Sequence, residues 1–270
     1  MHAPYAFKLN PCELAQWQDM GYFMRADQFT ASELDQLRDA AERAVLRAGR
    51  MASQGQTYFL DGRRFVDVDS ATIQYEYAPD AIGVKVLEPV QLFDQQLDQL
   101  IDDPRLKDPM VELVGTDTLA LWTAKLNMKP SGGSGFGWHQ DSPYWIHDCD
   151  HVDRLPNVML TLDRQDQYNG CFRVIRGSHQ QGMLPGTRDD TQLGGFYTDP
   201  TYFDVQHEDV LQAAAGTLIF FNPHIVHGSA DNHSDTPRRA LIFTYQPGGF
   251  PMLKNRQIRN VPVGGELGTT

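Results

Sequence analysis

Trp138-His139-Gln140-Asp141 is the stretch that decides the fold of this chain, read together with Val226-His227-Gly228-Ser229 further along the sequence. A histidine and an aspartate two residues apart, with one distant histidine, form the ligand set of the 2-His-1-carboxylate facial triad. That triad holds non-haem Fe(II) on one face and leaves the opposite positions open for oxygen and substrates. The sequence therefore predicts His139, Asp141 and His227 as metal ligands and as the catalytic residues.

Short apolar runs separated by Gly, Pro and Asn dominate the second half of the chain. Such runs are typical of antiparallel strands. They cover residues 119–128, 158–162, 172–175, 217–221 and 240–245. The two ligand segments follow the first and the fourth of these runs, so both are expected at strand ends.

The first half of the chain predicts helices and a stretch of strands. Helix starts are expected at Asn10-Pro11, where Asn is a cap and Pro the first helical residue, and at the capping box Thr30-Ala31-Ser32-Glu33. Gly21 and Gly49 are expected to end these two helices. Residues 50–87 read as strands and loops, and two further helices are expected around 93–101 and 104–114.

Several landmarks appear in a fixed order around the proposed ligands. Asn169-Gly170 and Gly177-Ser178-His179 lie between the two ligand segments, and Asn232, Ser234 and Arg238 follow the second. In this order the chain resembles the phytanoyl-CoA dioxygenase family of Fe(II)/2-oxoglutarate oxygenases, over about residues 15–250. One departure is Arg176, where the family usually has Pro before Gly-Ser-His, and it affects a turn rather than a ligand.

The resemblance implies both a fold and a reaction. The implied fold is mainly β with flanking α-helices: a double-stranded β-helix of the jelly-roll or cupin-like type, with the metal near the open end of the barrel. The implied cofactors are Fe(II), 2-oxoglutarate as co-substrate, and O2. The implied activity is hydroxylation of an unactivated C–H bond of a small-molecule metabolite, with release of succinate and CO2.

The spacing of the family also separates two rival histidines and two neighbouring arginines. His224 lies three residues before His227, but only His227 has Gly-Ser behind it and the downstream Asn and Arg at the family's spacing. Arg238 is suited to gripping a carboxylate, and strand alternation allows only one of Arg238 and Arg239 to face the interior. We predict Arg238 as the 2-oxoglutarate anchor, assisted by Ser229.

Other candidate site residues carry less specific signals. Asn127 is a candidate for holding the co-substrate from the facing strand, and a purely structural role for it is equally open. The predicted substrate-pocket residues are three aromatic residues near the ligands and one arginine that would favour an anionic substrate if it points inward: Trp138, Tyr144, Trp145 and Arg173. The dense His and Asp cluster at 147–153 suggests either a solvated lid or a second metal site.

Composition excludes some functions and favours others. A formal net charge of −12 over 270 residues argues against a nucleic-acid surface. Three cysteines without C-x-x-C spacing favour a reduced setting, and no run of 18 apolar residues indicates a membrane span. We therefore expect a cytoplasmic enzyme acting on a small molecule, without nucleic-acid or membrane partners.

We expect residues 1–270 to form one oxygenase domain, with N-terminal helices at about 11–115 bracing a β core at about 118–250. Two alternative functions remain open on the same fold. One is a cupin-like metal-dependent hydrolase or isomerase, and the other is a non-catalytic small-molecule binder. A requirement for 2-oxoglutarate separates the oxygenase from both.

Overall fold

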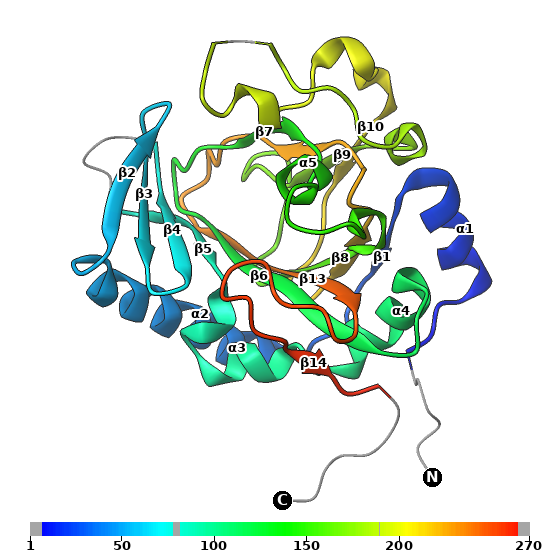
Figure 1. Ribbon diagram of the computed structural model, residues 1–270, viewed down its shortest axis with the longest axis horizontal. Helices are drawn as coiled ribbons and strands as arrows, with labels where there is room; N and C mark the ends of the chain where they lie inside the picture. The colour runs from blue at the N-terminus through cyan, green and yellow to red at the C-terminus, as the bar shows by residue number, and fades with distance from the viewer. Residues whose placement is uncertain (1–6, 78–81, 189, 264–270) are drawn as a thin grey trace, which may run out of the picture.

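Two antiparallel sheets make up most of the fold (Figure 1). The computed structural model describes residues 7–77, 82–188 and 190–263. The large sheet has the order β1-β11-β8-β13-β6-β5-β4-β3-β2, with β14 also paired to β6, and the small sheet has the order β10-β9-β12-β7. The mainly antiparallel β architecture agrees with the fold class predicted from the sequence.

The strands of the large sheet are β1 (Tyr22–Arg25), β2 (Gln56–Leu60), β3 (Arg63–Val68), β4 (Ala71–Tyr75), β5 (Val84–Glu88), β6 (Leu119–Lys129), β8 (Asn157–Thr161), β11 (Leu218–Phe221), β13 (Arg238–Pro247) and β14 (Asn260–Val261). Those of the small sheet are β7 (Phe136–His139), β9 (Phe172–Ile175), β10 (Glu208–Leu211) and β12 (His227–Ser229). The α-helices are α1 (Pro11–Met20), α2 (Ala31–Ala52), α3 (Gln95–Leu100), α4 (Pro104–Val114) and α5 (Ser142–Trp145).

The predicted helix starts are confirmed, and one predicted helix end is wrong. Asn10 and Thr30 both form complete capping boxes, and Gly21 ends α1 in the left-handed conformation. Helix α2, however, runs through Gly49 to Ala52. A single glycine lowers helix stability by only about 1 kcal/mol, and the buried stripe of α2, which reaches Ala48, holds the helix against the core on the N-terminal side of this position.

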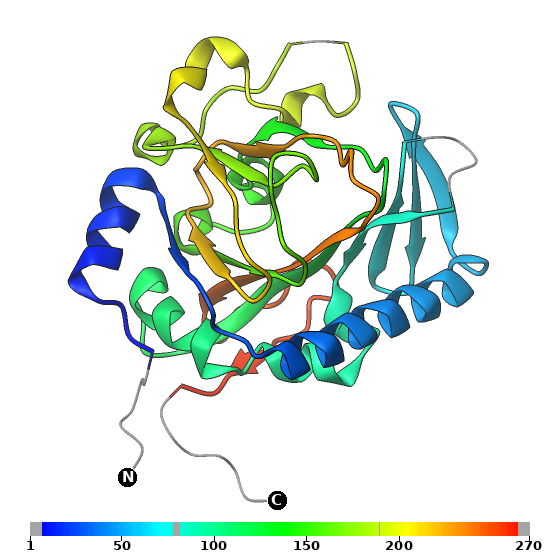
Figure 2. The same cartoon turned by 180° about the vertical axis from the view of Figure 1, so that it is seen from behind.

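The N-terminal part does more than brace a β core. Strand β1 pairs with β11, and the β2–β5 meander continues the large sheet beyond β6. The expected division into N-terminal helices and a later β core is therefore wrong in its boundary, because one sheet contains strands from both parts. Figure 2 shows α2 and α3 on the outer side of this sheet, where they cover its apolar face.

The register of β5, β6 and β13 gives the large sheet two different faces. Leu87, Leu126 and Leu241 lie on one face and pack in the core beneath the helices. Because alternate residues of a strand point to opposite sides, Lys125 and Lys129 lie on the other face of β6. Lysine is rarely placed in an interior, so this inner face is the place to look for a binding site.

No helix in residues 7–77, 82–188 or 190–263 is long and apolar enough to cross a membrane.

Candidate functional site

The three predicted ligands come together between the two sheets. His139 at the end of β7 lies directly opposite His227 at the start of β12, so the two rings project from the same side of the small sheet. Asp141 follows β7 and caps α5, where its backbone N–H donates to Pro223 O at 3.1 Å. One ligand atom from each of the three residues lies within 4.8 Å of the others.

Hydrogen bonds orient both imidazoles for metal binding. His139 Nδ1 contacts Gly137 O at 2.7 Å, and His227 Nδ1 contacts Ile225 O at 3.0 Å. A carbonyl oxygen can only accept, so Nδ1 carries the hydrogen and Nε2 keeps a free lone pair. Burial lowers the pKa of His139 to about 3, with a further contribution from His227, and burial also lowers the pKa of His227. Both rings are therefore neutral at neutral pH, as metal ligation requires.

Asp141 is held as a carboxylate by its neighbours. Burial alone would raise the pKa of Asp141, but Lys125 and the two histidines lower it below its ordinary value. Asn157 Nδ2 donates to Asp141 Oδ2 at 2.9 Å, and Thr244 Oγ1 in turn donates to Asn157 Oδ1 at 2.6 Å. This chain of contacts from β13 and β8 fixes Oδ2, while Oδ1 lies 3.8 Å from Lys125 Nζ.

Arg238 lies in the interior, as the family's spacing predicted. Its side chain is buried, Nη2 donates to Gly170 O at 2.7 Å, and Nε has no hydrogen-bond partner among the described residues. Burial lowers the pKa of Arg238 to about 10, so the guanidinium remains charged. A buried cation with an unsatisfied N–H is the environment that an incoming carboxylate would complete.

Two buried lysines that the sequence reasoning missed lie in the same region. Lys129 pairs with Arg238 in register and its Nζ contacts Ser229 Oγ at 2.8 Å, Gly170 O at 3.1 Å and Ala230 O at 2.5 Å. Burial lowers the pKa of Lys129 to about 6, with contributions from Arg238 and Lys85, and burial lowers that of Lys85 to about 8. For Lys129 the sequence contained a signal of an inward-facing polar side chain, because polar residues alternate at 125, 127 and 129 within a mainly apolar run.

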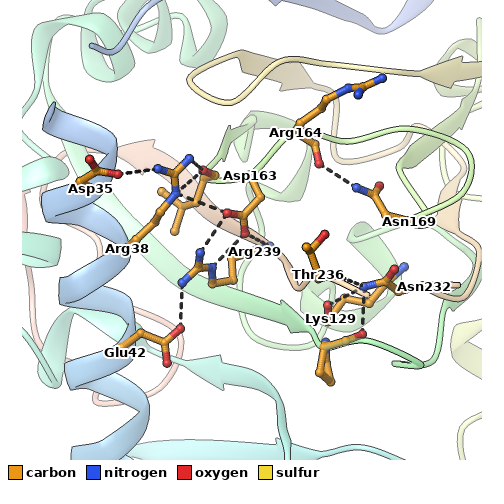
Figure 3. Close-up of polar contacts among 12 residues, drawn as sticks. Asp35, Arg38, Glu42, Lys129, Asp163, Arg164, Asn169, Asn232, Thr236 and Arg239 are labelled. Carbon is orange, nitrogen blue, oxygen red and sulfur yellow. Dashed lines mark hydrogen bonds and ion pairs between the residues drawn. The ribbon is translucent and has the colours of Figure 1, made fainter. Parts of the chain in front are cut away.

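Arg239 has a different environment on the outer face (Figure 3). Its guanidinium donates to Asp163 Oδ2 at 2.9 Å and to Glu42 Oε1 at 2.8 Å. Arg38 approaches the same Asp163 at 3.3 Å. Arg38, Asp163 and Arg239 line a surface hollow of about 550 Å3. Both of these arginines are already paired with acids.

The predicted pocket residues divide into two groups. The Tyr144 ring lies 5.9 Å from the His139 ring and stacks on Phe196, so Tyr144 is beside the triad. Asn127 lies on the inner face of β6 between the two lysines. Trp145 is fully buried against Trp122, so it belongs to the packing beneath the site.

Trp138 and Arg173 do not lie where the sequence reasoning expected. Arg173 pairs in register with Gly228, whose neighbour His227 faces the triad, so Arg173 points to the other side of the small sheet. There it stacks over Trp138 at 5.4 Å and forms an ion pair with Glu208. The pocket-lining prediction is therefore wrong for both residues.

The rival histidine and the acidic cluster are not metal sites in this structure. His224 is held between Ser142 Oγ at 2.8 Å and Asp153 Oδ1 at 2.7 Å, away from a ligand position. His151 contacts Gln246, and Asp148 approaches Arg256. Among the described residues, His139, Asp141 and His227 are the group of ligand-type side chains close enough to share a metal ion.

Comparisons with known proteins agree with this geometry. A methylphosphonate hydroxylase from Gimesia maris is 23% identical over 88% of this chain and 80% of its own length. An L-proline trans-4-hydroxylase from Streptomyces griseoviridis is 27% identical over 60% of this chain and 67% of its own. The structure of EctD from S. alaskensis with 2-oxoglutarate and 5-hydroxyectoine superimposes with a TM-score of 0.67 at 20% identity, over 91% of this chain and 81% of that one.

The structural likeness shows the double-stranded β-helix fold, and the relatives named above are hydroxylases. The profile of the phytanoyl-CoA dioxygenase (PhyH) family matches residues 17–240, which include all three members of the triad and Arg238. The chain therefore belongs to the phytanoyl-CoA dioxygenase family.

Proposed function

We propose that this protein is an Fe(II)/2-oxoglutarate-dependent dioxygenase that hydroxylates a C–H bond of a small molecule. One observation carries the proposal: a triad of two neutral histidines and a carboxylate lies between the two sheets, and the inner face of the large sheet carries a buried, partly unsatisfied arginine. A metal-dependent hydrolase or isomerase needs the first feature but not the second. The large sheet contains strands from both halves of the chain, which also supports residues 1–270 as one oxygenase domain.

Each residue has a defined part in this proposal. His139, Asp141 and His227 would hold Fe(II) through the two Nε2 atoms and a carboxylate oxygen. Arg238 would bind the distal carboxylate of 2-oxoglutarate through the unsatisfied Nε, with Ser229 Oγ and Lys129 Nζ completing the site. Once bound, the iron and its co-substrate supply the oxidation by O2 that releases succinate and CO2, while the protein orients the groups and excludes water.

Strand β12 links the triad to the proposed site for the distal carboxylate. Ser229 is two residues from His227 on β12, and its hydroxyl contacts Lys129, which pairs with Arg238. The distal carboxylate site is therefore connected to the triad through a single short strand. Asn127 lies between Lys125 and Lys129 on β6. It would contact the middle of a co-substrate that extends from Arg238 to the triad.

The relatives support a small-molecule substrate, since one acts on a phosphonate and another on proline. Tyr144, beside His139, would border such a substrate. The presence of a carboxylate at Asp141 also supports insertion of oxygen into a C–H bond, because halogenases that resemble this family lack the carboxylate.

The direct test is anaerobic assembly of the complex. Adding Fe(II) and then 2-oxoglutarate to the metal-free protein is expected to produce a weak visible charge-transfer absorption with a stoichiometry of one. Succinate, which lacks the keto oxygen needed for chelation, serves as the control and should produce none. A metal-loaded protein whose spectrum does not respond to 2-oxoglutarate would contradict the proposal and favour the hydrolase or the non-catalytic binder.

Co-substrate binding should also take up protons. Burial holds the pKa of Lys129 at about 6, and a carboxylate bound beside it must raise that pKa because opposite charges stabilise each other. We expect uptake of up to one proton per 2-oxoglutarate at about pH 7.5, and affinity that falls as pH rises through the raised pKa. Calorimetry in two buffers of different ionisation enthalpy measures this uptake.

Lys129→Met is expected to remove most of this proton uptake, and Lys107→Met, at an exposed position, is expected to leave it unchanged. Binding that is independent of the buffer in the unsubstituted protein would show that Lys129 is already charged, and this prediction would then be wrong.

A further inference from the structure

Lys125 is a partly buried cation that the proposed co-substrate site does not use. It lies on the inner face of β6, where Nζ is 3.8 Å from Asp141 Oδ1 and 5.2 Å from the centre of the Trp145 ring. An ammonium group has three hydrogens to donate. Within residues 7–77, 82–188 and 190–263, however, no acceptor lies within hydrogen-bonding distance of this one.

The other two inner lysines differ in this respect. Lys129 Nζ contacts three oxygens, and Lys85 Nζ contacts Ser134 and Gly135 O, the latter at 2.8 Å. Both therefore already have hydrogen-bond acceptors within the protein. Lys125 has none among the described residues, and 22% of its side-chain surface is exposed, so a ligand can reach its ammonium group.

Lys125 is too far along the strand to share the distal carboxylate of the co-substrate. Lys129 is the register partner of Arg238, and Lys125 precedes it by four residues on the same strand. At about 3.3 Å per residue, the two lysines are separated by about 13 Å. Lys125 instead lies beside Asp141, at the end of the inner face of β6 that is nearer to the triad.

A purely structural role as counter-ion to Asp141 does not account for this lysine. The carboxylate already accepts a hydrogen bond from Asn157 at 2.9 Å, and the Lys125 contact at 3.8 Å is longer than a hydrogen bond. Glu88 on β5 also attracts Lys125 electrostatically, but Glu88 Oε1 already accepts a hydrogen bond from Thr123 Oγ1 at 2.6 Å. Neither of these two carboxylates accepts a hydrogen bond from Lys125.

We infer that Lys125 binds the anionic group of the substrate, and that the substrate is a small organic acid whose oxidised carbon lies within a few bonds of that group. The inference rests on the proposed function, because it places the substrate next to the triad. The short separation follows from the structure: an oxyanion about 2.8 Å from Lys125 Nζ would lie close to Asp141, because Nζ is 3.8 Å from Asp141 Oδ1. A phosphonate or a carboxylate satisfies the same chemistry.

Binding can be tested without turnover. Protein loaded with Zn(II) and 2-oxoglutarate is titrated by calorimetry with methylphosphonate and, separately, with propionate. Dimethyl methylphosphonate and propionamide are the uncharged comparisons. We expect at least one acid to bind at least about tenfold more tightly than its neutral analogue, since hydrogen bonds to charged groups are strong. The two acid arms distinguish a phosphonate substrate from a carboxylate substrate.

Three variants assign the effect to Lys125. Lys125→Met, which keeps the length of the side chain, is expected to weaken binding of that acid about tenfold or more and to leave 2-oxoglutarate affinity within about twofold. Lys125→Arg should retain most of the acid binding. Lys107→Met, which removes an exposed lysine, should behave as the unsubstituted protein.

The outcomes separate the inference from the proposed function. Equal binding of acid and neutral analogue, failure of both acids to bind, or unchanged acid binding in Lys125→Met, as metal coordination alone would produce, each overturns the inference. In all three cases, normal 2-oxoglutarate binding would leave the proposed function standing. Loss of 2-oxoglutarate affinity in Lys125→Met also overturns the inference, because it would place Lys125 on the co-substrate.

Discussion

Asp141→Ala is expected to lower Fe(II) affinity by more than about 100-fold and to remove succinate release. The estimate is a lower bound, because changing a residue that only supports a metal ligand already costs roughly 10–100-fold, and Asp141 is proposed as a ligand itself. The variant loses the only carboxylate of the triad and leaves Asn157 Nδ2 without its acceptor. Metal content after dialysis and succinate formation are the two measurements.

Two controls make this result interpretable. Asp141→Asn keeps the shape of the side chain and separates loss of the charge from loss of packing, while Asp150→Ala removes an exposed acid from the 147–153 cluster and should change neither measurement. Circular dichroism checks that the fold is retained. If Asp141→Ala kept near-normal succinate formation, the triad would have to be assigned to other residues.

Arg238→Ala is expected to raise the 2-oxoglutarate concentration needed for half-saturation by roughly 30-fold or more. Removing one member of a buried, charge-assisted pair costs about 2–5 kcal/mol, and each 1.4 kcal/mol, roughly, corresponds to a tenfold change. Fe(II) binding should survive, because no metal ligand is altered. Arg238→Met, which fills more of the space, and Arg238→Lys, which keeps a charge without the planar fork, separate packing from carboxylate recognition.

Arg239→Ala is the matched control for this experiment. Its guanidinium is engaged with Asp163 and Glu42 on the outer face, so the substitution should lower stability modestly and leave 2-oxoglutarate affinity almost unchanged. Titration of 2-oxoglutarate in both variants gives the comparison. A larger affinity defect in Arg239→Ala would reverse the proposed roles of the two residues.

Part of the fold could be predicted because its signals are local. The capping residues Asn10 and Thr30 act within one helical turn, and the helix 104–114 is bounded by Pro104 and Gly115 in the sequence and in the structure. Gly49 was misjudged because a glycine ends a helix only if its backbone turns left-handed. Whether it does so depends on packing beyond that turn, and α2 continues.

The positions of Trp138 and Arg173 could not be predicted from the sequence. His139 pairs with His227, but Phe136 pairs with Ser229, so β7 has one more residue than β12 between these two pairs. Such a bulge breaks the simple alternation of faces. The bulge leaves Phe136 on the same side as His139. Trp138, the neighbour of His139, takes the outer side by alternation, and only long-range contacts, the pairing of β9 with β12 among them, place Arg173 and Phe203 beside it.

The sequence by itself predicted the three triad residues, because ligand chemistry is a property of short segments. Strand alternation allowed only one of the two adjacent arginines to point inward, and the family's spacing selected Arg238. Only the tertiary structure decided that Lys125 and Lys129 lie on the inner face of the large sheet and that the Gly170 carbonyl joins Lys129 to Arg238. Gly170 lies 68 residues from Arg238 in the chain. Contacts across such separations depend on sheet pairing, and sheet pairing sets the charge of the site.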